Sequence, residues 1–189
     1  IIHRCEAGDV TKKMRDGVKK FTFAPTFGGM GMNELPHIQT YFREFFKIYK
    51  GLAQYHKSLM DGVLHDGIVQ TPSGRQYHWP DAKRFKNGRI SNATQVVNYP
   101  VQGFGNDLVQ LACVRAHRRF KETQLKSLLI LTVHDSIVID THPDEVTEVN
   151  QILEWAMVDV LTEAQERWGH TFILPLKIEG SSGANWLMD

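Results

Sequence analysis

Hydrophobic and polar positions in the first third of the chain follow a helical repeat. Between residues 9 and 24, apolar side chains recur every three to four positions, and basic side chains fill most of the remainder. The glycine-rich segment 28–31 interrupts the pattern, and a second helical repeat, rich in aromatic residues, covers about 34–64. This spacing predicts two helical segments separated by a break.

Alternating positions and turn residues come next. Residues 66–80 alternate and contain Pro72-Ser73-Gly74, which predicts a β-hairpin. A long helix is expected after Pro100, ending near residue 123. The apolar runs 128–133 and 137–140 predict two buried strands joined by a tight turn.

The last part of the chain is expected to contain one more helix and one more strand. An amphipathic helix is predicted to open at 143–145 and to end near Gly169, followed by a strand at 172–178. Because helices come first and a hairpin, helix and strand follow, the predicted fold class is α+β.

Charge adds a second level of organisation. The net charge of +1 conceals a basic segment, residues 1–126, with 20 Lys and Arg against 10 Asp and Glu, and an acidic one, residues 127–189, with 2 against 11. A basic body suits a polyanion such as nucleic acid, and acidic groups can hold cations. Chance segregation of solvated charge gives the same pattern.

Composition narrows the setting of the protein. Two cysteines are too few for a disulfide framework, and we expect a cytoplasmic location in a bacterium or a phage-infected host. No apolar run approaches the ~20 residues of a membrane span, so no membrane partner is expected. The chain starts at Ile1 rather than Met, from which we expect the natural chain to begin further upstream.

Four side chains spaced by four residues form the first candidate site: Arg15, Lys19, Phe23 and Phe27. On a helix each step of four advances about 40° beyond a full turn, so the four make one slowly winding stripe. Two cations followed by two aromatics would suit a nucleotide, with the cations on phosphates and the rings against sugar and base. A surface helix with solvated cations and packed aromatics has the same spacing.

A tight turn forms the second candidate site. His134-Asp135-Ser136 separates the two apolar runs, and an acid held between two buried strands would be rigidly placed, as a metal ligand requires. Asp and Ser are also ordinary turn residues.

Together these segments resemble DNA polymerase family A, the DNA polymerase I-like enzymes. The stripe with Gly28 is similar to the family's fingers-helix motif, and His134-Asp135 resembles its catalytic palm hairpin. Three further segments resemble family motifs in the same order: Thr71-Pro72-Ser73-Gly74-Arg75, Asn98-Tyr99-Pro100-Val101-Gln102-Gly103 and Gly183-Ala184-Asn185-Trp186. His3, twelve residues ahead of Arg15, is spaced as in phage members of the family.

The resemblance implies a partial polymerase domain. Residues 1–65 would be helical fingers, and 66–189 would be part of a palm whose antiparallel sheet carries the catalytic hairpin near 128–140. The thumb and the remaining palm would lie in a missing N-terminal portion, which would be a partner of this chain.

The resemblance also implies a role for each site residue. His3, Arg15 and Lys19 would grip the triphosphate of the incoming deoxynucleotide, and Lys19 would also give a proton to the departing pyrophosphate. Phe23 would lie against the deoxyribose and Phe27 near the templating base.

Primer–template DNA would be the other ligand. Asn98 and Gln102 would reach the minor groove near the primer end, where acceptors look alike for every base pair, and Arg75 and His134 would also contact DNA. Asp135 would be one of two aspartates bridging two Mg²⁺ ions, with catalysis shared between Asp135 and Lys19. The second aspartate stands upstream of the fingers helix in the family, so it is expected outside this chain.

Several residues depart from the family pattern, and two other interpretations remain open. Ser136 stands where Glu is frequent, Phe27 replaces the usual Tyr, and Pro25 is expected to bend or end the fingers helix. A single-subunit phage-type RNA polymerase shares the spacing from Lys19 to the aromatic and often has His-Asp-Ser. A non-catalytic DNA-binding remnant is the third interpretation, because one metal ligand is missing.

Overall fold

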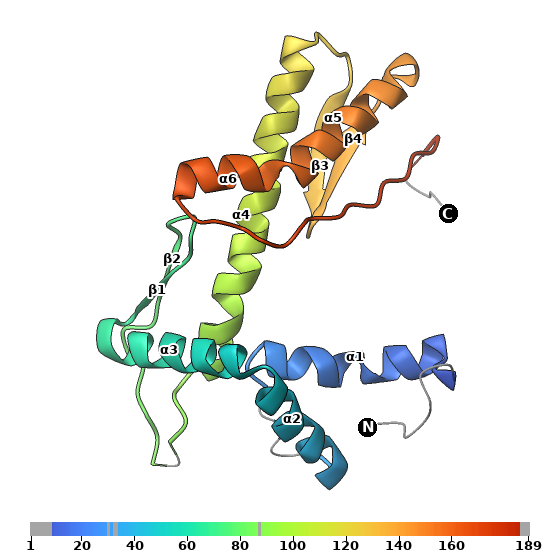
Figure 1. Ribbon diagram of the computed structural model, residues 1–189. Helices are drawn as coiled ribbons and strands as arrows, with labels where there is room; N and C mark the ends of the chain where they lie inside the picture. The colour runs from blue at the N-terminus through green and yellow to red at the C-terminus, as the bar shows by residue number, and fades with distance from the viewer. Residues whose placement is uncertain (1–8, 30, 32–33, 87, 186–189) are drawn as a thin grey trace. The chain divides into compact units, whose positions relative to one another are not determined.

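The computed structural model describes residues 9–29, 31, 34–86 and 88–185, and every structural statement below concerns these residues. The elements follow in the order α1 (Lys12–Thr26), α2 (Pro36–Ile48), α3 (Lys50–Asp66), β1 (Ile68–Gln70), β2 (Gln76–His78), α4 (Ala93–Glu122), β3 (Leu128–Val133), β4 (Ser136–Asp140), a 3₁₀ turn η2 (Pro143–Glu145), α5 (Val146–Val158) and α6 (Val160–Trp168) (Figure 1).

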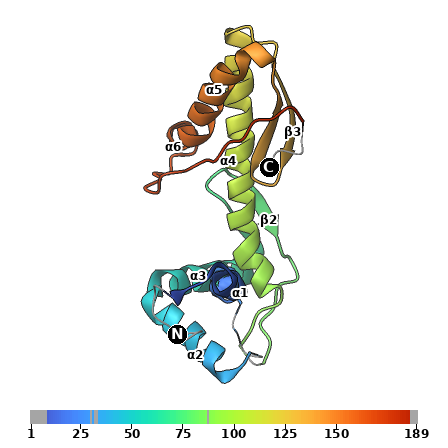
Figure 2. The same ribbon diagram turned by 90° about the vertical axis from the view of Figure 1, so that its right-hand side faces the viewer.

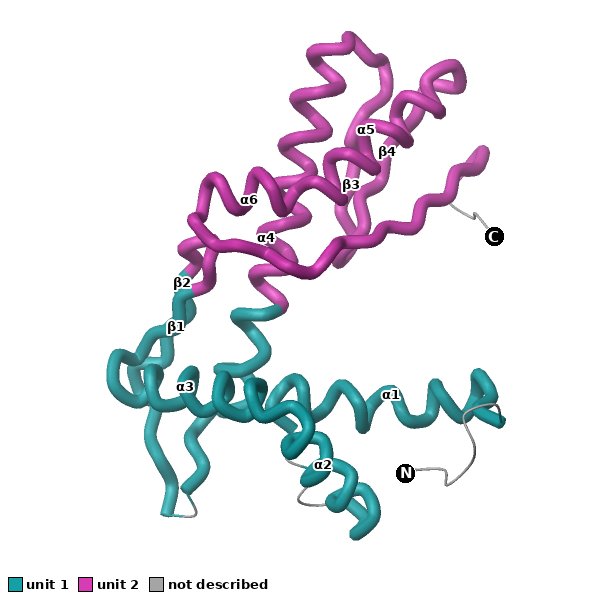
Figure 3. Tube along the Cα trace, viewed as in Figure 1, with its two compact units in different colours: residues 1–70, 76–101 teal, residues 71–75, 102–189 magenta. Residues whose placement is uncertain are grey.

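The chain divides into two compact units. Unit 1 comprises residues 1–70 and 76–101, and unit 2 comprises 71–75 and 102–189 (Figure 3). Unit 1 is mainly helical with a small antiparallel pair, β1–β2, and unit 2 combines helices with the antiparallel pair β3–β4. The α+β class expected from the sequence is confirmed.

Helix α1 begins and ends at residues that explain its limits. The Thr11 hydroxyl caps it by accepting the Met14 amide at 3.2 Å. The helix passes through Pro25 and ends one residue later, at Thr26, close to where the proline was expected to bend or end it. Gly28 then adopts a φ of +82°, a left-handed conformation that a glycine reaches without strain.

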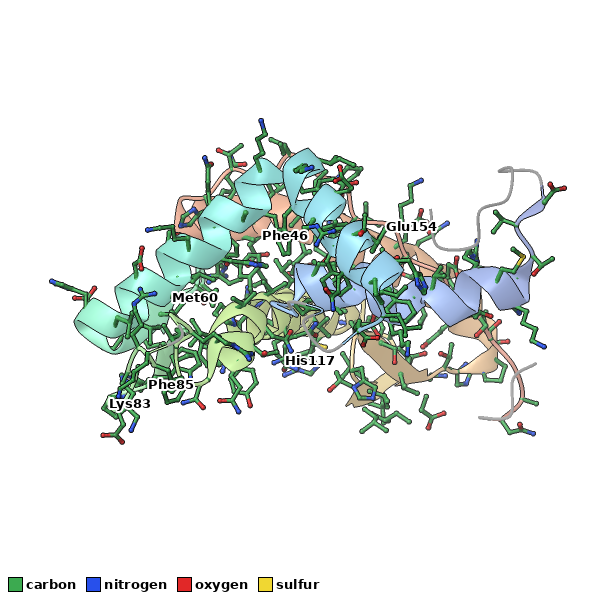
Figure 4. The ribbon with its side chains drawn as sticks, turned by 90° about the horizontal axis from the view of Figure 1, so that it is seen from below. Phe46, Met60, Lys83, Phe85, His117 and Glu154 are labelled. Atoms are coloured by element: carbon green, nitrogen blue, oxygen red, sulfur yellow. The ribbon has the colours of Figure 1, made fainter. Side chains whose placement is uncertain are left out.

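The single helical segment expected over 34–64 is two helices. Tyr49 leaves the helical conformation, with φ −99° and ψ 60°, and its amide donates to the Phe45 carbonyl. Helix α3 starts at Lys50 and runs to Asp66, where Gly67 closes it in the left-handed conformation. Figure 4 labels one residue of each helix, Phe46 on α2 and Met60 on α3.

Helix α4 starts earlier than the sequence pattern suggests, at Ala93 instead of after Pro100. The first turns are held by Val96 and Val97, which are both fully buried. Burial of two valines stabilises by about 3–6 kcal/mol, which is enough to offset the cost of about 3 kcal/mol for a proline inside a helix. Val96 belongs to the core of unit 1, together with Val63, Val69, Trp79 and Ile90.

Unit 2 has its own core. The C-terminal half of α4 contributes Ala116 and Phe120, and α5 contributes Val149, Ile152 and Ala156. Leu129 of β3 and Ile139 of β4 pack against this cluster, so the hairpin and α5 both lie along α4 (Figure 2). The two strands pair antiparallel, with an irregularity in register between Leu129 and Leu131.

Two expectations for the last part of the chain are wrong. The helix expected from 143 to 169 is interrupted at Asp159, which separates α5 from α6. The segment 172–178 forms no strand; Ile173 and Leu174 are largely exposed, and no described strand pairs with them. Pro175 also lacks the N–H that a ladder needs, so the apolar pattern alone does not make a strand. None of the described helices combines the length and the apolar character needed to cross a membrane.

Candidate functional site

The stripe on α1 is exposed to solvent along most of its length. Arg15 and Lys19 are exposed, and the Phe23 side chain keeps 55% of its surface accessible. Lys19 Nζ lies 2.8 Å from the Asp16 carboxylate, an ion pair between two exposed side chains. Such pairs are weak because water and salt screen both charges, so Lys19 can exchange this partner for a phosphate at small cost. The pKa of Asp16 is lowered, chiefly by the hydrogen bond from Lys19.

The two aromatics of the stripe stack on each other at the end of α1. The ring centroids of Phe23 and Phe27 are 6.4 Å apart, with an angle of 25° between the planes. Phe27 is half-buried and stands one residue after the helix. An exposed ring stacked on a half-buried one, beside two cations, is an arrangement able to accept a base or sugar next to a phosphate chain.

The turn after the stripe is packed against the start of α4. A Cβ at Gly28 would lie 3.2 Å from Val97 Cβ, and one at Gly29 would lie 2.7 Å from the Ala24 carbonyl oxygen. Only glycine permits this approach together with the φ of +82° at Gly28. The end of α1 is therefore fixed next to Val97, the residue before Asn98.

The second candidate site lies at the tip of the β3–β4 hairpin. Val133 and Ser136 are paired, so His134 and Asp135 form the two-residue turn, and both are exposed. His134 has a φ of 55°, which costs a non-glycine residue on the order of 1 kcal/mol. The Ser136 hydroxyl donates to the Val133 carbonyl at 2.8 Å, so Ser136 closes the turn.

The strands that carry Asp135 are not both buried, contrary to the expectation from their composition. Four apolar side chains of β3 keep between 38% and 60% of their surface exposed: Leu128, Ile130, Leu131 and Val133. Sequence composition predicted two buried faces because nearly every residue is apolar. The structure covers only one side, with Leu129 and Ile139 packed against the core of unit 2.

The base of the hairpin is anchored by Glu145. Its carboxylate accepts hydrogen bonds from the amides of Lys126 and Ser127, both at 2.9 Å, and from the Ser127 hydroxyl at 2.6 Å. The Ser127 hydroxyl oxygen in turn accepts the His142 amide at 2.9 Å. These bonds, that of the Lys126 amide first, lower the pKa of Glu145. Both strands are thus tied together at the end opposite to Asp135.

The two residues expected at the DNA minor groove both lie on α4. Gln102 is exposed. Asn98 is half-buried, and its Oδ1 atom is buried without a hydrogen-bond partner in the described part of the chain. An orphan acceptor of this kind costs free energy unless a donor reaches it.

Arg75 is engaged by a residue that the sequence did not single out. Its guanidinium forms an ion pair with Asp107 of α4, with Nε 3.0 Å from Oδ1, and the Ser73 hydroxyl donates to the same carboxylate. Burial raises the pKa of Asp107, but the bonds from Arg75 and Ser73 outweigh burial and lower it. The loop 71–75 is thereby held on α4.

The predicted site residues fall into separate groups. The α1 stripe and Asn98 belong to unit 1, and Arg75, Gln102, His134 and Asp135 belong to unit 2. His3 lies outside the described residues. Within the described ranges, no cluster of three or more His, Cys, Asp or Glu side chains could hold a metal, so Asp135 stands without companion ligands there. A cavity of about 610 Å³ in unit 2, lined by residues such as Arg115 and Trp155, contains none of the predicted site residues.

Sequence reasoning did not identify Asp107, Glu145 or Val97, because the residues that they contact are distant in the sequence. Asp107 bonds residues 32 and 34 positions away, and Glu145 bonds residues 18 and 19 positions away. A helical or strand period reports only neighbours within a few positions. The one signal for Asp107 in the sequence was its position as an acidic residue in a segment of α4 that is otherwise rich in amide and small side chains.

Comparison with known proteins extends over nearly the whole chain. Residues 1–188 match the model of the family described as "DNA polymerase family A". DNA polymerase I of Lactococcus lactis is 26% identical over 190 residues, covering 96% of this chain and 20% of the relative. The DNA polymerase of Bacillus phage SP01 is 31% identical over 192 residues, covering 94% of this chain and 21% of the relative. The chain therefore spans about a fifth of the length of these relatives.

A solved structure has a similar fold. The POL domain of Pol1 from M. smegmatis, in complex with DNA primer-template and dNTP, superposes with a TM-score of 0.72 over 84% of this chain and 29% of the Pol1 chain. The sequence identity is 22%, so this likeness concerns the fold. With the family model matched over residues 1–188, the chain belongs to DNA polymerase family A.

Proposed function

We propose that this chain provides the nucleotide-binding helix and one catalytic aspartate of a DNA-directed DNA polymerase. The reaction would be template-directed transfer of a deoxynucleotide to a primer 3′-OH during DNA replication. The observation that carries the proposal is the exposed stripe of Arg15, Lys19 and Phe23 on α1, in a chain that matches the family over residues 1–188. We assign residues 1–65 to the fingers and 66–189 to part of the palm.

The stripe supplies the chemistry for the incoming nucleotide. Arg15 and Lys19, with His3, would hold the triphosphate, and Lys19 would donate a proton to the leaving pyrophosphate oxygen. Phe23 would pack against the deoxyribose, and Phe27 would stack near the templating base. The exposed Phe23 ring, stacked on Phe27, supports this assignment.

Asp135 would hold the metal. A carboxylate on an exposed two-residue turn suits Mg²⁺, which prefers oxygen ligands, and family membership implies a divalent cation. Bound Mg²⁺ would activate the primer hydroxyl and neutralise the pyrophosphate charge. The role of this chain is to fix the Asp135 carboxylate; a second aspartate is expected from another part of the polymerase.

Another part of the polymerase would also cover β3. Four apolar side chains of this strand are exposed, and β3 pairs only with β4 among the described strands. Exposed apolar side chains and an unpaired strand edge are both liabilities for a folded protein in water, and both call for a covering segment. We propose that the upstream palm and thumb portion is this partner, together with primer–template DNA contacted by Asn98, Gln102, Arg75 and His134.

The cellular location and the alternative RNA polymerase function are the two remaining parts of the proposal. The low cysteine content supports a location in the cytoplasm of a bacterium or a phage-infected host. A phage-type RNA polymerase is disfavoured because Phe27 lacks the hydroxyl that would help to recognise a ribonucleotide, and because the two relatives described above are DNA polymerases.

Primer extension tests the proposal. The chain would be assayed alone and together with the upstream portion of its polymerase, with Mg²⁺ and either deoxy- or ribonucleotides. We expect extension with deoxynucleotides only when both portions are present. Efficient extension by the 189-residue chain alone would show that no second carboxylate from another portion is needed. A preference for ribonucleotides would favour the RNA polymerase interpretation instead.

A further inference from the structure

His56 is a buried, titratable side chain to which the proposed reaction assigns no role. It lies in the middle of α3 and keeps only 5% of its surface exposed. Its Nε2 atom lies 3.1 Å from the carbonyl oxygen of Thr26, the last residue of α1. A carbonyl oxygen only accepts, so His56 donates from Nε2 to the end of the helix that carries the stripe.

The Thr26 carbonyl is a group that the helix itself leaves without a partner. The last carbonyls of any helix lack the amide of the following turn. The carbonyls of Phe23, Ala24 and Pro25 receive the amides of Phe27, Gly29 and Gly28 respectively. Within the described residues the bond to the Thr26 carbonyl comes from His56, which is 30 positions away in the sequence.

The surroundings of His56 favour the neutral, donating ring. The imidazole contacts the Phe46 ring edge to face, with centroids 6.0 Å apart, and the Tyr55 ring at 6.3 Å. Burial lowers the pKa of His56, and the bond to Thr26 offsets only part of this effect. A neutral imidazole carries one proton, and the Thr26 carbonyl places it on Nε2.

The end of α1 is therefore held from two sides. His56 of α3 fixes the Thr26 carbonyl, and Val97 of α4 packs against Gly28. Phe27 lies between these two anchors, and its ring stacks on Phe23. A shift of Thr26 would move Phe27 directly, because the two residues share a peptide bond.

We propose that His56 is a positioning residue, which sets the place of Phe27 and hence the fit of the nucleotide against the templating base. This inference rests on the proposed function of α1. The donated hydrogen bond is the active feature: an apolar side chain of similar size fills the space but leaves the Thr26 carbonyl without a donor.

Three variants separate donation from shape. His56→Gln keeps a donor at nearly the same reach, and His56→Leu removes it. His65→Leu is the matched control, because His65 lies on the same helix with 86% of its side chain exposed. Hydrogen exchange of the complete 189-residue chain would follow the amides of Phe27, Gly28 and Gly29, with the Arg15 amide at the other end of α1 as the internal reference.

We expect His56→Leu to accelerate exchange at Phe27, Gly28 and Gly29 by about 5- to 10-fold, as loss of one hydrogen bond predicts, with Arg15 unchanged. His56→Gln and His65→Leu should match the unmutated chain. Equal exchange in all chains would overturn the anchoring role. Equal acceleration in His56→Gln and His56→Leu would show that ring shape, and not donation, holds the helix end.

The polymerase assay then tests the effect on function. In the polymerase that contains this chain and its upstream portion, His56→Leu should raise KM for the correct deoxynucleotide about 5- to 10-fold, with kcat within about twofold and rescue by His56→Gln. A normal KM in His56→Leu, measured well below its unfolding temperature, would refute the positioning role. Absence of extension by the unmutated polymerase would instead refute the proposed function, and the exchange experiment would still decide whether His56 anchors α1.

Discussion

The end of α1 and the β3–β4 hairpin carry the two halves of the proposed chemistry, and they are supported in different ways. The end of α1 is enclosed by its own unit: His56 bonds the Thr26 carbonyl and Val97 packs against Gly28. The hairpin is anchored by Glu145 at its base, whereas much of the apolar surface of β3 is exposed.

This difference separates preorganisation within the chain from preorganisation that, in the proposed polymerase, depends on a further segment covering β3. A binding group must be held by packing and hydrogen bonds before the ligand arrives. Unit 1 supplies such support to Phe27 from described residues. The turn with Asp135 has support on one side of the hairpin only, where Leu129 and Ile139 pack against the core of unit 2.

Asp135→Asn should have the largest effect. In the polymerase assembled from this chain and its upstream portion, the loss of one metal-binding charge should lower kcat by about 100- to 1,000-fold while DNA affinity changes little. Asp140→Asn is the matched control, an exposed aspartate at the far end of β4. Steady-state primer extension and DNA binding measure both quantities, and a rate within threefold of the unmutated enzyme would remove Asp135 from the metal site.

Phe23→Tyr tests whether the stripe faces the sugar. The new hydroxyl can replace the missing 3′-OH of a dideoxynucleotide, and one hydrogen bond to a charged oxygen changes discrimination by about 10- to 150-fold. Phe27→Tyr should leave dideoxy exclusion unchanged. Competitive incorporation of dideoxy- against deoxynucleotide gives the ratio of the two incorporation rates. Equal ratios for Phe23→Tyr and the unmutated enzyme would show that the stripe does not face the nucleotide.

Gly28→Ala should disturb the packing against Val97 that holds the end of α1. The added Cβ would lie 3.2 Å from Val97 at a φ of +82°, so we expect a loss of about 1–3 kcal/mol in the free energy of unfolding. Gly17→Ala is the control, because a Cβ there meets nothing within 4 Å and should stabilise the helix by about 0.5–1 kcal/mol. Urea unfolding of both variants gives the comparison, and a neutral Gly28→Ala would mean that α1 ends without this support.

Glu145→Gln should have the smallest effect, and one that depends on pH. The folded pKa of Glu145 lies below its ordinary value of 4.5, so the ionised carboxylate stabilises the fold above pH 4.5 and this contribution is lost as the pH falls through the folded pKa. The difference in urea midpoint between the unmutated chain and Glu145→Gln should therefore be present at pH 7 and shrink below pH 4.5. A difference in urea midpoint that stays constant with pH would show that Glu145 does not anchor the hairpin through its charge.

Elements defined by local patterns were predicted from the sequence. The spacing of Arg15, Lys19 and Phe23 predicted a stripe on one helix, and the turn residues predicted both hairpins. Helix ends depend on more distant residues: α4 starts before Pro100 because burial of Val96 and Val97 outweighs the missing N–H. The apolar segment 172–178 remains irregular because a strand requires a partner as well as a pattern.

The amino-acid sequence by itself determined the family, the order of the motifs and the residue types available for each site, since these depend on the identity and spacing of residues along the chain. Only the tertiary structure decided that Asp107 holds Arg75, that His56 bonds the end of α1 and that β3 exposes its apolar side chains. The physical reason is range. Helical and strand periods record neighbours within a few positions, whereas these contacts join residues 30 or more positions apart, and the exposure of β3 depends on what packs against it in space.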